Sequence, residues 1–187
     1  IRDSVHTDED ALAKFAESGT GIAHCPTSNC RLGSGIAPVV SMAAAGMPIS
    51  LGVDGSASAE SGSMANEAML TWLLHRAIDG ASSTSLEQVK QWSTVGGADL
   101  LGLNIGRICV GACADLVFFD LSEPRYAGLW MPEYAPIVCG EPVQVSRTML
   151  NGRWRAIDGQ LVDIDTKKLL LKAEEKIRRL SNRIVGV

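Results

Sequence analysis

Apolar residues in the first half of the chain alternate between two periodicities. Short apolar runs at 20–26 and 49–53, bounded by Gly and Pro, are typical of buried strands. Apolar residues at intervals of three or four predict helices over about 36–45 and 63–79. The predicted buried face of the second helix consists of Ala65, Met69, Trp72 and Leu73. The alternation of strands and helices predicts βα units and a parallel sheet.

Capping patterns predict three further helices. Thr7 with Asp10 resembles a capping box, and so does Ser85 with Gln88. A short third helix is expected to end near Gly102. The residues expected to be buried on the first two of these helices are Leu12, Phe15, Ala16, Leu86, Val89 and Trp92.

The pattern becomes β-rich from about residue 105. The stretch 106–121 predicts two short strands around a turn at Gly111, and Asn151-Gly152 predicts the turn of a hairpin. A final amphipathic helix is indicated by Leu170, Ala173, Ile177, Leu180 and Ile184. Its stripe covers only two heptads, so we interpret it as a docking face and not as a coiled coil.

Composition narrows the class of partner. The 187 residues are 46% hydrophobic and 20% charged, with a net charge of −4, which indicates a globular chain and argues against nucleic acid as a partner. No apolar run reaches the roughly 18 residues of a membrane span, so no membrane partner is expected. Five cysteines without paired C-x2-C spacing suit reduced thiols in the cytoplasm.

Two polar residues stand where the predicted parallel strands end. Asp54 follows the 49–53 strand, and His24 ends the 20–26 strand. Active residues gather at such carboxyl ends, where an aspartate can serve as metal ligand and as base. The alternatives are a turn aspartate bonded by local amides and a histidine of the core. Ser28 and Asn29 either shape a turn or contact a substrate.

These candidates do not complete a metal site. A catalytic zinc usually takes three protein ligands, and the sequence contains neither H-x-H nor H-E-x-x-H. We interpret His6 and His75, which lie in helical context, as structural.

Several ordered motifs resemble the amidohydrolase superfamily, in its cytosine-deaminase-like and chlorohydrolase-like branch. SGTGIAHCPTSNCRLGSGIAPV and GMPISLGVDGSAS resemble the last strands of its barrel, and GRICVGACADLVFFDL and TMLNGRWRAIDGQL resemble its returning β-sandwich segments. GVDGSASAESGSMANEAML, with RYAGLWMPEYAPIVCG downstream, is most similar to the 8-oxoguanine and isoxanthopterin deaminases.

This resemblance implies an α/β fold class. It implies the C-terminal part of a (β/α)8 TIM-type hydrolase barrel over 1–104, segments of a small β-sandwich over 105–165, and a C-terminal helix over 166–187. It also implies one divalent metal, zinc or iron, held by an H-x-H after the first strand, a histidine after the fifth and an aspartate after the eighth. Asp54 matches that aspartate and is assigned as metal ligand and catalytic base.

Two other positions take roles from the resemblance. His24 matches the seventh-strand motif, whose histidine lies near the metal pocket, and we assign His24 and Asn29 to substrate binding. In DSVHT, Asp3 stands where the family has a histidine that orients the water or the substrate.

The implied reaction is hydrolytic deamination of a purine- or pterin-like heterocycle. Metal-bound hydroxide attacks the carbon that carries the amine, Asp54 shuttles the proton, and ammonia leaves. Because the other ligands are missing from these 187 residues, we expect a fragment that is inactive alone, binds metal weakly or not at all, and is stable with the missing part or as a homo-oligomer. The alternatives are a non-catalytic module and a sibling hydrolase of chlorinated or aminated triazine-like rings.

Overall fold

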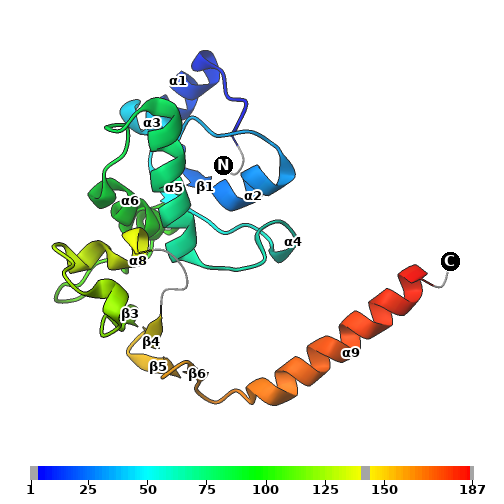
Figure 1. Cartoon of the computed structure of the whole chain (residues 1–187). Helices are drawn as coiled ribbons and strands as arrows, with labels where there is room; N and C mark the ends of the chain where they lie inside the picture. Colours follow the sequence, from blue (N-terminus) through cyan, green and yellow to red (C-terminus); the bar gives the residue numbers. More distant parts are fainter. Residues whose placement is uncertain (1–3, 140–143, 186–187) are drawn as a thin grey trace. The chain divides into compact units, whose positions relative to one another are not determined.

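The computed structural model describes residues 4–139 and 144–185 (Figure 1). Asp3, the position aligned with a family histidine, lies outside the described residues. The chain divides into two compact units, residues 1–113 with 121–143 and residues 114–120 with 144–187. The predicted division at residues 104 and 165 follows the architecture of the family and stays a prediction.

The first unit alternates short strands with helices. In chain order it contains α1 (Glu9–Glu17), β1 (Ile22–His24), α2 (Pro26–Leu32), α3 (Val39–Ala44), β2 (Ile49–Leu51), α4 (Ser56–Ala59), α5 (Met64–Asp79), α6 (Leu86–Ser93), α7 (Val95–Leu101), the 3₁₀ turns η1 (Pro124–Tyr126) and η2 (Pro132–Tyr134), and α8 (Ala135–Val138). The helices and strands predicted over 1–104 are therefore confirmed, and α2 and α4 are additions.

The two strands of this unit run parallel, as the alternation predicts. Ile22 pairs with Ile49 and His24 with Leu51. All three residues of β2 are buried, whereas β1 buries its first and last residues. The core around them consists of Ile22, Ala37, Val39, Met42, Met47, Ile49, Leu51, Ala68, Val89, Trp92 and Ile137. This mixed α/β unit is an open pair of strands in the residues described.

The first helix is capped one residue later than predicted. The side chain of Asp8 accepts a hydrogen bond from the amide of Ala11 at 2.8 Å, while the Thr7 hydroxyl donates to the carbonyl of Ser4 at 3.0 Å. The prediction of Thr7 as the cap is therefore wrong. The second predicted cap is confirmed, because Ser85 accepts from the amide of Gln88 at 3.1 Å.

The predicted strand before Gly111 is also wrong. Residues 107–110 form bends and the start of a turn instead of a strand, and Ile108 and Val110 are exposed. Asn104 closes the segment on itself: its side-chain amide donates to the carbonyl of Gly111, and its own carbonyl accepts from the amide of Cys113. Local polar bonds thus use backbone groups that a strand would have offered to a neighbour.

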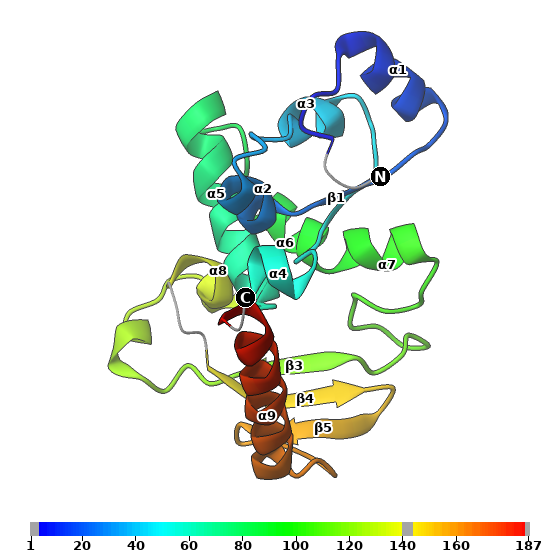
Figure 2. The ribbon, with the colours of Figure 1, turned by 90° about the vertical axis from the view of Figure 1, so that its right-hand side faces the viewer.

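The second unit is an antiparallel sheet followed by a long helix (Figures 1 and 2). It contains β3 (Leu116–Phe119), β4 (Val145–Leu150), β5 (Arg153–Ile157), β6 (Gln160–Leu161) and α9 (Thr166–Val185), with the strands in sequence order. The predicted hairpin turn is confirmed, with φ 47° at Asn151 and 74° at Gly152.

The final helix is present, but its docking role stays a prediction. Its apolar side chains, including Leu170, Ile177 and Leu180, are exposed. Ile184 lies in the last turn, where side chains are outside the described part. In the ranges that the structure describes, no helix is both long and apolar enough to cross a membrane.

Candidate functional site

The carboxyl ends of β1 and β2 meet at one edge of the parallel pair. The amide of Gly52, just beyond β2, donates to the carbonyl of His24 at 2.8 Å and continues the pairing past the last strand residue. Asp54 follows two residues later. The predicted parallel ends and their adjacency are therefore confirmed, which places Asp54 in the loop where βα enzymes carry their reactive groups.

The carboxylate of Asp54 is held from two helices. Its Oδ2 accepts hydrogen bonds from the hydroxyls of Ser28 in α2 (2.7 Å) and Ser58 in α4 (3.0 Å). Ser58 has one hydroxyl proton, which it shares with the carbonyl of Gly55 at 3.0 Å, so Ser28 is the stronger donor. The alternative of a turn aspartate that is bonded only by local amides does not describe this geometry.

The backbone at Asp54 is in the left-handed region, with φ 59°. A non-glycine residue in this region costs roughly 1–2 kcal/mol. Such a conformation persists where surrounding contacts over-determine it, as is common at functional sites. The two serine hydroxyls, from elements on either side of β2 in sequence, are such contacts.

The imidazole of His24 is directed at α5. Its Nε2 lies 3.3 Å from Nε2 of His75, and both side chains are about 1% exposed. Burial, with a smaller contribution from the charge of a protonated His75, lowers the pKa of His24 to about 3. His24 is therefore neutral at physiological pH, and its predicted contact with substrate stays a prediction.

Asn29, the other predicted substrate contact, is buried on α2. It is 2% exposed, and within the described part of the chain its Nδ2 donor has no hydrogen-bond partner. Leaving a buried donor unsatisfied costs roughly 1–3 kcal/mol, so this amide is poised to donate. Its role toward a substrate stays a prediction.

The buried face of α5 differs from the predicted one. Leu73 is 49% exposed, and the buried residues are instead Glu67, Ala68, Thr71 and His75. The correction has a polar cause, because Glu67 Oε2 accepts from the amide of Thr27 at 3.1 Å and His75 meets His24. Sequence reasoning missed Glu67 and Ser58; the spacing of Glu67, Thr71 and His75 at intervals of four was the available signal.

The fit of the described residues to a metal rests on Asp54 alone. Asp54 fits as a carboxylate ligand, since its oriented oxygens suit zinc or iron. Across residues 4–139 and 144–185, no group of three or more His, Cys, Asp or Glu side chains could hold a metal ion. A complete ligand set therefore requires donors beyond those described.

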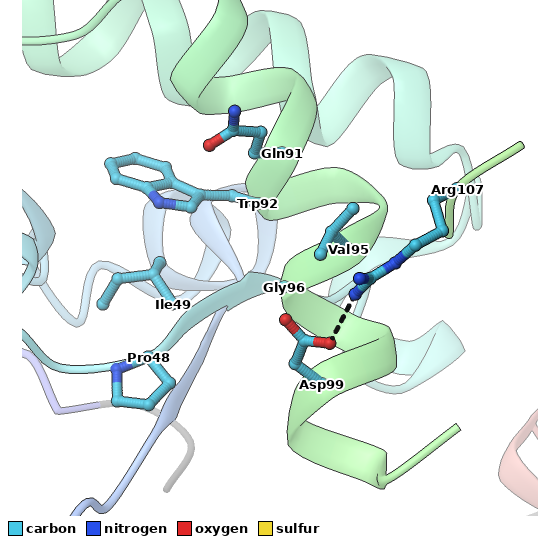
Figure 3. A pocket seen from close by; sticks show the side chains of 8 residues that line it. All are labelled: Pro48, Ile49, Gln91, Trp92, Val95, Gly96, Asp99 and Arg107. Carbon is cyan, nitrogen blue, oxygen red and sulfur yellow. Dashed lines mark hydrogen bonds and ion pairs between the residues drawn. The ribbon is translucent and has the colours of Figure 1, made fainter. Parts of the chain in front are cut away.

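A hollow lies where α6 and α7 face the start of β2 (Figure 3). Its volume is about 510 Å³, and its lining includes Pro48 and Ile49, at the start of the strand. Its lining also includes Arg107 and Asp99. Their side chains are both exposed and form an ion pair at 2.9 Å. Because reactive groups collect at strand carboxyl ends, we place the candidate site at Asp54 and not in this hollow.

Comparison with known proteins decides the family. The model of the amidohydrolase family matches residues 1–155. The chain belongs to the amidohydrolase family. It is 39% identical over 197 residues to an isoxanthopterin deaminase from an unknown prokaryotic organism, covering 97% of this chain and 41% of the relative. It is 41% identical over 169 residues to the 8-oxoguanine deaminase of Pseudomonas aeruginosa, covering 90% and 37%.

Solved structures agree with this amidohydrolase assignment. An amidohydrolase from a Sargasso Sea environmental sample superimposes with a TM-score of 0.86 at 38% identity, covering 98% of this chain and 42% of that one. An adenosine deaminase from Xanthomonas campestris, with bound zinc, gives 0.90 at 30% identity, covering 100% and 42%. The chain thus spans about two fifths of the length of these relatives.

Proposed function

We propose that this chain forms the C-terminal portion of a metal-dependent amidohydrolase that deaminates a purine- or pterin-like heterocycle. In this proposal β1 and β2 are the last strands of a (β/α)8 barrel, whose other strands lie outside the 187 residues. One observation carries it: Asp54, the residue matching the family's last metal ligand, stands beyond a parallel strand with its carboxylate oriented by Ser28 and Ser58.

Asp54 would act as metal ligand and as proton carrier. A divalent metal, zinc or iron, when bound, acidifies a water for attack on the ring carbon. The hydroxyl donors of Ser28 and Ser58 stabilise the carboxylate as an anion, the form that both binds a cation and accepts a proton. Asp54 takes the proton of the attacking water and delivers it to the amine nitrogen, which leaves as ammonia.

The pattern of relatives supports an amine as the leaving group. The isoxanthopterin and 8-oxoguanine deaminases are 39% and 41% identical to this chain, whereas the triazine hydrolases of known structure are 25–26% identical. The fold itself is compatible with either leaving group. We assign the buried amide of Asn29 as a donor to the ring, and we expect a cytoplasmic homo-oligomer.

The test is an Asp54→Asn substitution in the full reading frame that contains this chain. Asparagine tolerates the left-handed backbone at least as well as aspartate, so the change isolates the charge. We expect kcat for ammonia release from isoxanthopterin or 8-oxoguanine to fall on the order of 10²-fold or more. Asp158, also a left-handed aspartate (φ 49°) but exposed in the turn between β5 and β6, provides the matched Asp158→Asn control.

Three results would contradict the proposal. They are near-normal turnover in Asp54→Asn, equal losses in both variants, and a full reading frame without an H-x-H motif upstream of Ile1. The last result would favour a non-catalytic module. Hydrolysis of a chlorinated triazine in preference to both aminated bicyclic rings would instead replace the proposed leaving group.

A further inference from the structure

A row of buried polar side chains on α5 faces the corner where β1 turns into α2. Glu67, Thr71 and His75 recur at intervals of four residues and are each at most 1% exposed. Glu67 accepts from the amide of Thr27 at 3.1 Å, and His75 lies 3.3 Å from His24. The two contacts are separated by about 12 Å along the helix, so α5 holds the corner at two points.

The proton positions in this row follow from Asp79. Its carboxylate Oδ2, on a side chain 42% exposed, lies 3.3 Å from Nδ1 of His75. A carboxylate only accepts, so Nδ1 of a neutral His75 carries the proton and its Nε2 is an acceptor. The Nε2 of His24 must then donate, and Nδ1 of His24 keeps its lone pair. The opposite order would leave Nδ1–H of His24 as a buried donor, at a nitrogen with no partner among the described residues.

We propose that Asp79 and His75 are positioning residues, which order the protons of two buried imidazoles and thereby fix the β1–α2 corner that carries Ser28. The corner then presents the Ser28 hydroxyl to Asp54 at 2.7 Å. Only the consequence for Asp54 chemistry rests on the proposed function. The proton order and the rigidity of the corner do not depend on metal or turnover.

The proton order is testable by long-range ¹H–¹⁵N correlation spectra of the 187-residue chain. The chain has three histidines, and exposed His6 serves as the reference signal. At pH 7 we expect His24 protonated on Nε2 and His75 on Nδ1, with neither ring charged. Asp79→Ala should turn His75 into a mixture of tautomers, whereas Asp79→Asn retains an acceptor oxygen and should preserve the order.

The rigidity of the corner is testable in the same samples by amide hydrogen exchange. The amide of Thr27 donates to Glu67, and the amide of Gly52 donates to the carbonyl of His24. In Asp79→Ala we expect both amides to exchange about tenfold faster, because a factor of ten corresponds to about the free energy of one lost hydrogen bond. Asp99→Ala, which removes another exposed, paired aspartate, is the matched control and should change neither spectrum nor exchange.

Two results would overturn the inference. One is His75 protonated on Nε2 in the unmodified chain. The other is unchanged exchange at Thr27 and Gly52 in Asp79→Ala. A normal turnover of Asp54→Asn in the complete enzyme would instead contradict the proposed function, and it would leave both of these measurements as they stand.

Discussion

Near the carboxyl ends of β1 and β2, several residues adopt a backbone conformation or a buried position that costs free energy. Contacts with specific neighbouring side chains stabilise them there. Asp54 takes a left-handed backbone, which Ser28 and Ser58 hold through the carboxylate. His24 and His75 are buried imidazoles. Burial lowers the pKa of both, and the carboxylate of Asp79 opposes part of the shift at His75. These residues make the edge sensitive to protonation.

Acid should therefore destabilise the fold before the carboxyl groups titrate. Since the pKa of His24 is about 3 in the folded chain and 6.5 for an ordinary solvent-exposed histidine, the unfolded state binds the extra proton between these limits. Stability is then full above pH 6.5 and falls by up to about 1.4 kcal/mol per pH unit below it. Urea unfolding at pH 7.5, 6.5 and 5.5 measures this slope.

The substitution that isolates this effect is His24→Asn. We expect it to lower stability at pH 7.5, because the bond to His75 is lost, and to flatten the slope between pH 6.5 and 5.5. A slope as steep as that of the unmodified chain would show that His24 takes up its proton in the folded state.

At the scale of elements, the close packing of α7 against β2 depends on a glycine, which has no side chain at the point of contact. A Cβ built at Gly96 would collide with the carbonyl oxygen of Ile49, whereas one at Gly97 meets nothing within 4 Å. The clashing atoms belong to the backbone of Ile49, so no change of side-chain rotamer could relieve the clash. Glycine at 96 therefore sets how closely the helix approaches the strand that delivers Asp54.

Two alanine substitutions in one helix test this close packing. Gly96→Ala should destabilise the chain by about 1–3 kcal/mol through overpacking. Gly97→Ala, its matched control, should be neutral or stabilising by up to about 1 kcal/mol, since alanine is the better helix former. Thermal or urea unfolding gives both values, and an equal response of the two variants would contradict the close approach.

Patterns of apolar residues predict these elements well and their polar contacts poorly. The βα alternation, the hairpin at Asn151-Gly152 and the position of Asp54 follow from periodicity, turn chemistry and motif. The buried row on α5 does not, because a hydrophobic stripe cannot reveal that Glu67 and His75 are buried by pairing with Thr27 and His24. Such pairs join residues 40 and 51 positions apart, which only the fold brings together.

At the scale of the whole molecule, the first unit presents an open pair of strands. Within the ranges described, β1 and β2 each have one strand neighbour, and apolar side chains such as Leu101 and Trp130 are 73% and 93% exposed. Unpaired strand edges and exposed apolar surface favour association. The relatives extend well beyond the region this chain matches, which is consistent with the proposed barrel being completed by other strands.

The same incompleteness predicts how the 187-residue chain responds to zinc. Catalytic zinc takes three protein ligands plus water, and in the proposed site Asp54 is one of these ligands. A single carboxylate provides only a small part of the free energy of zinc binding. After purification with added zinc and dialysis, we therefore expect clearly less than one zinc per chain. Mass spectrometry measures this metal content. Asp54→Asn should match the unmodified chain here, yet lower metal content in the complete enzyme. One equivalent of zinc in the 187-residue chain, lost on Asp54→Asn, would show that the chain assembles the site from its own side chains.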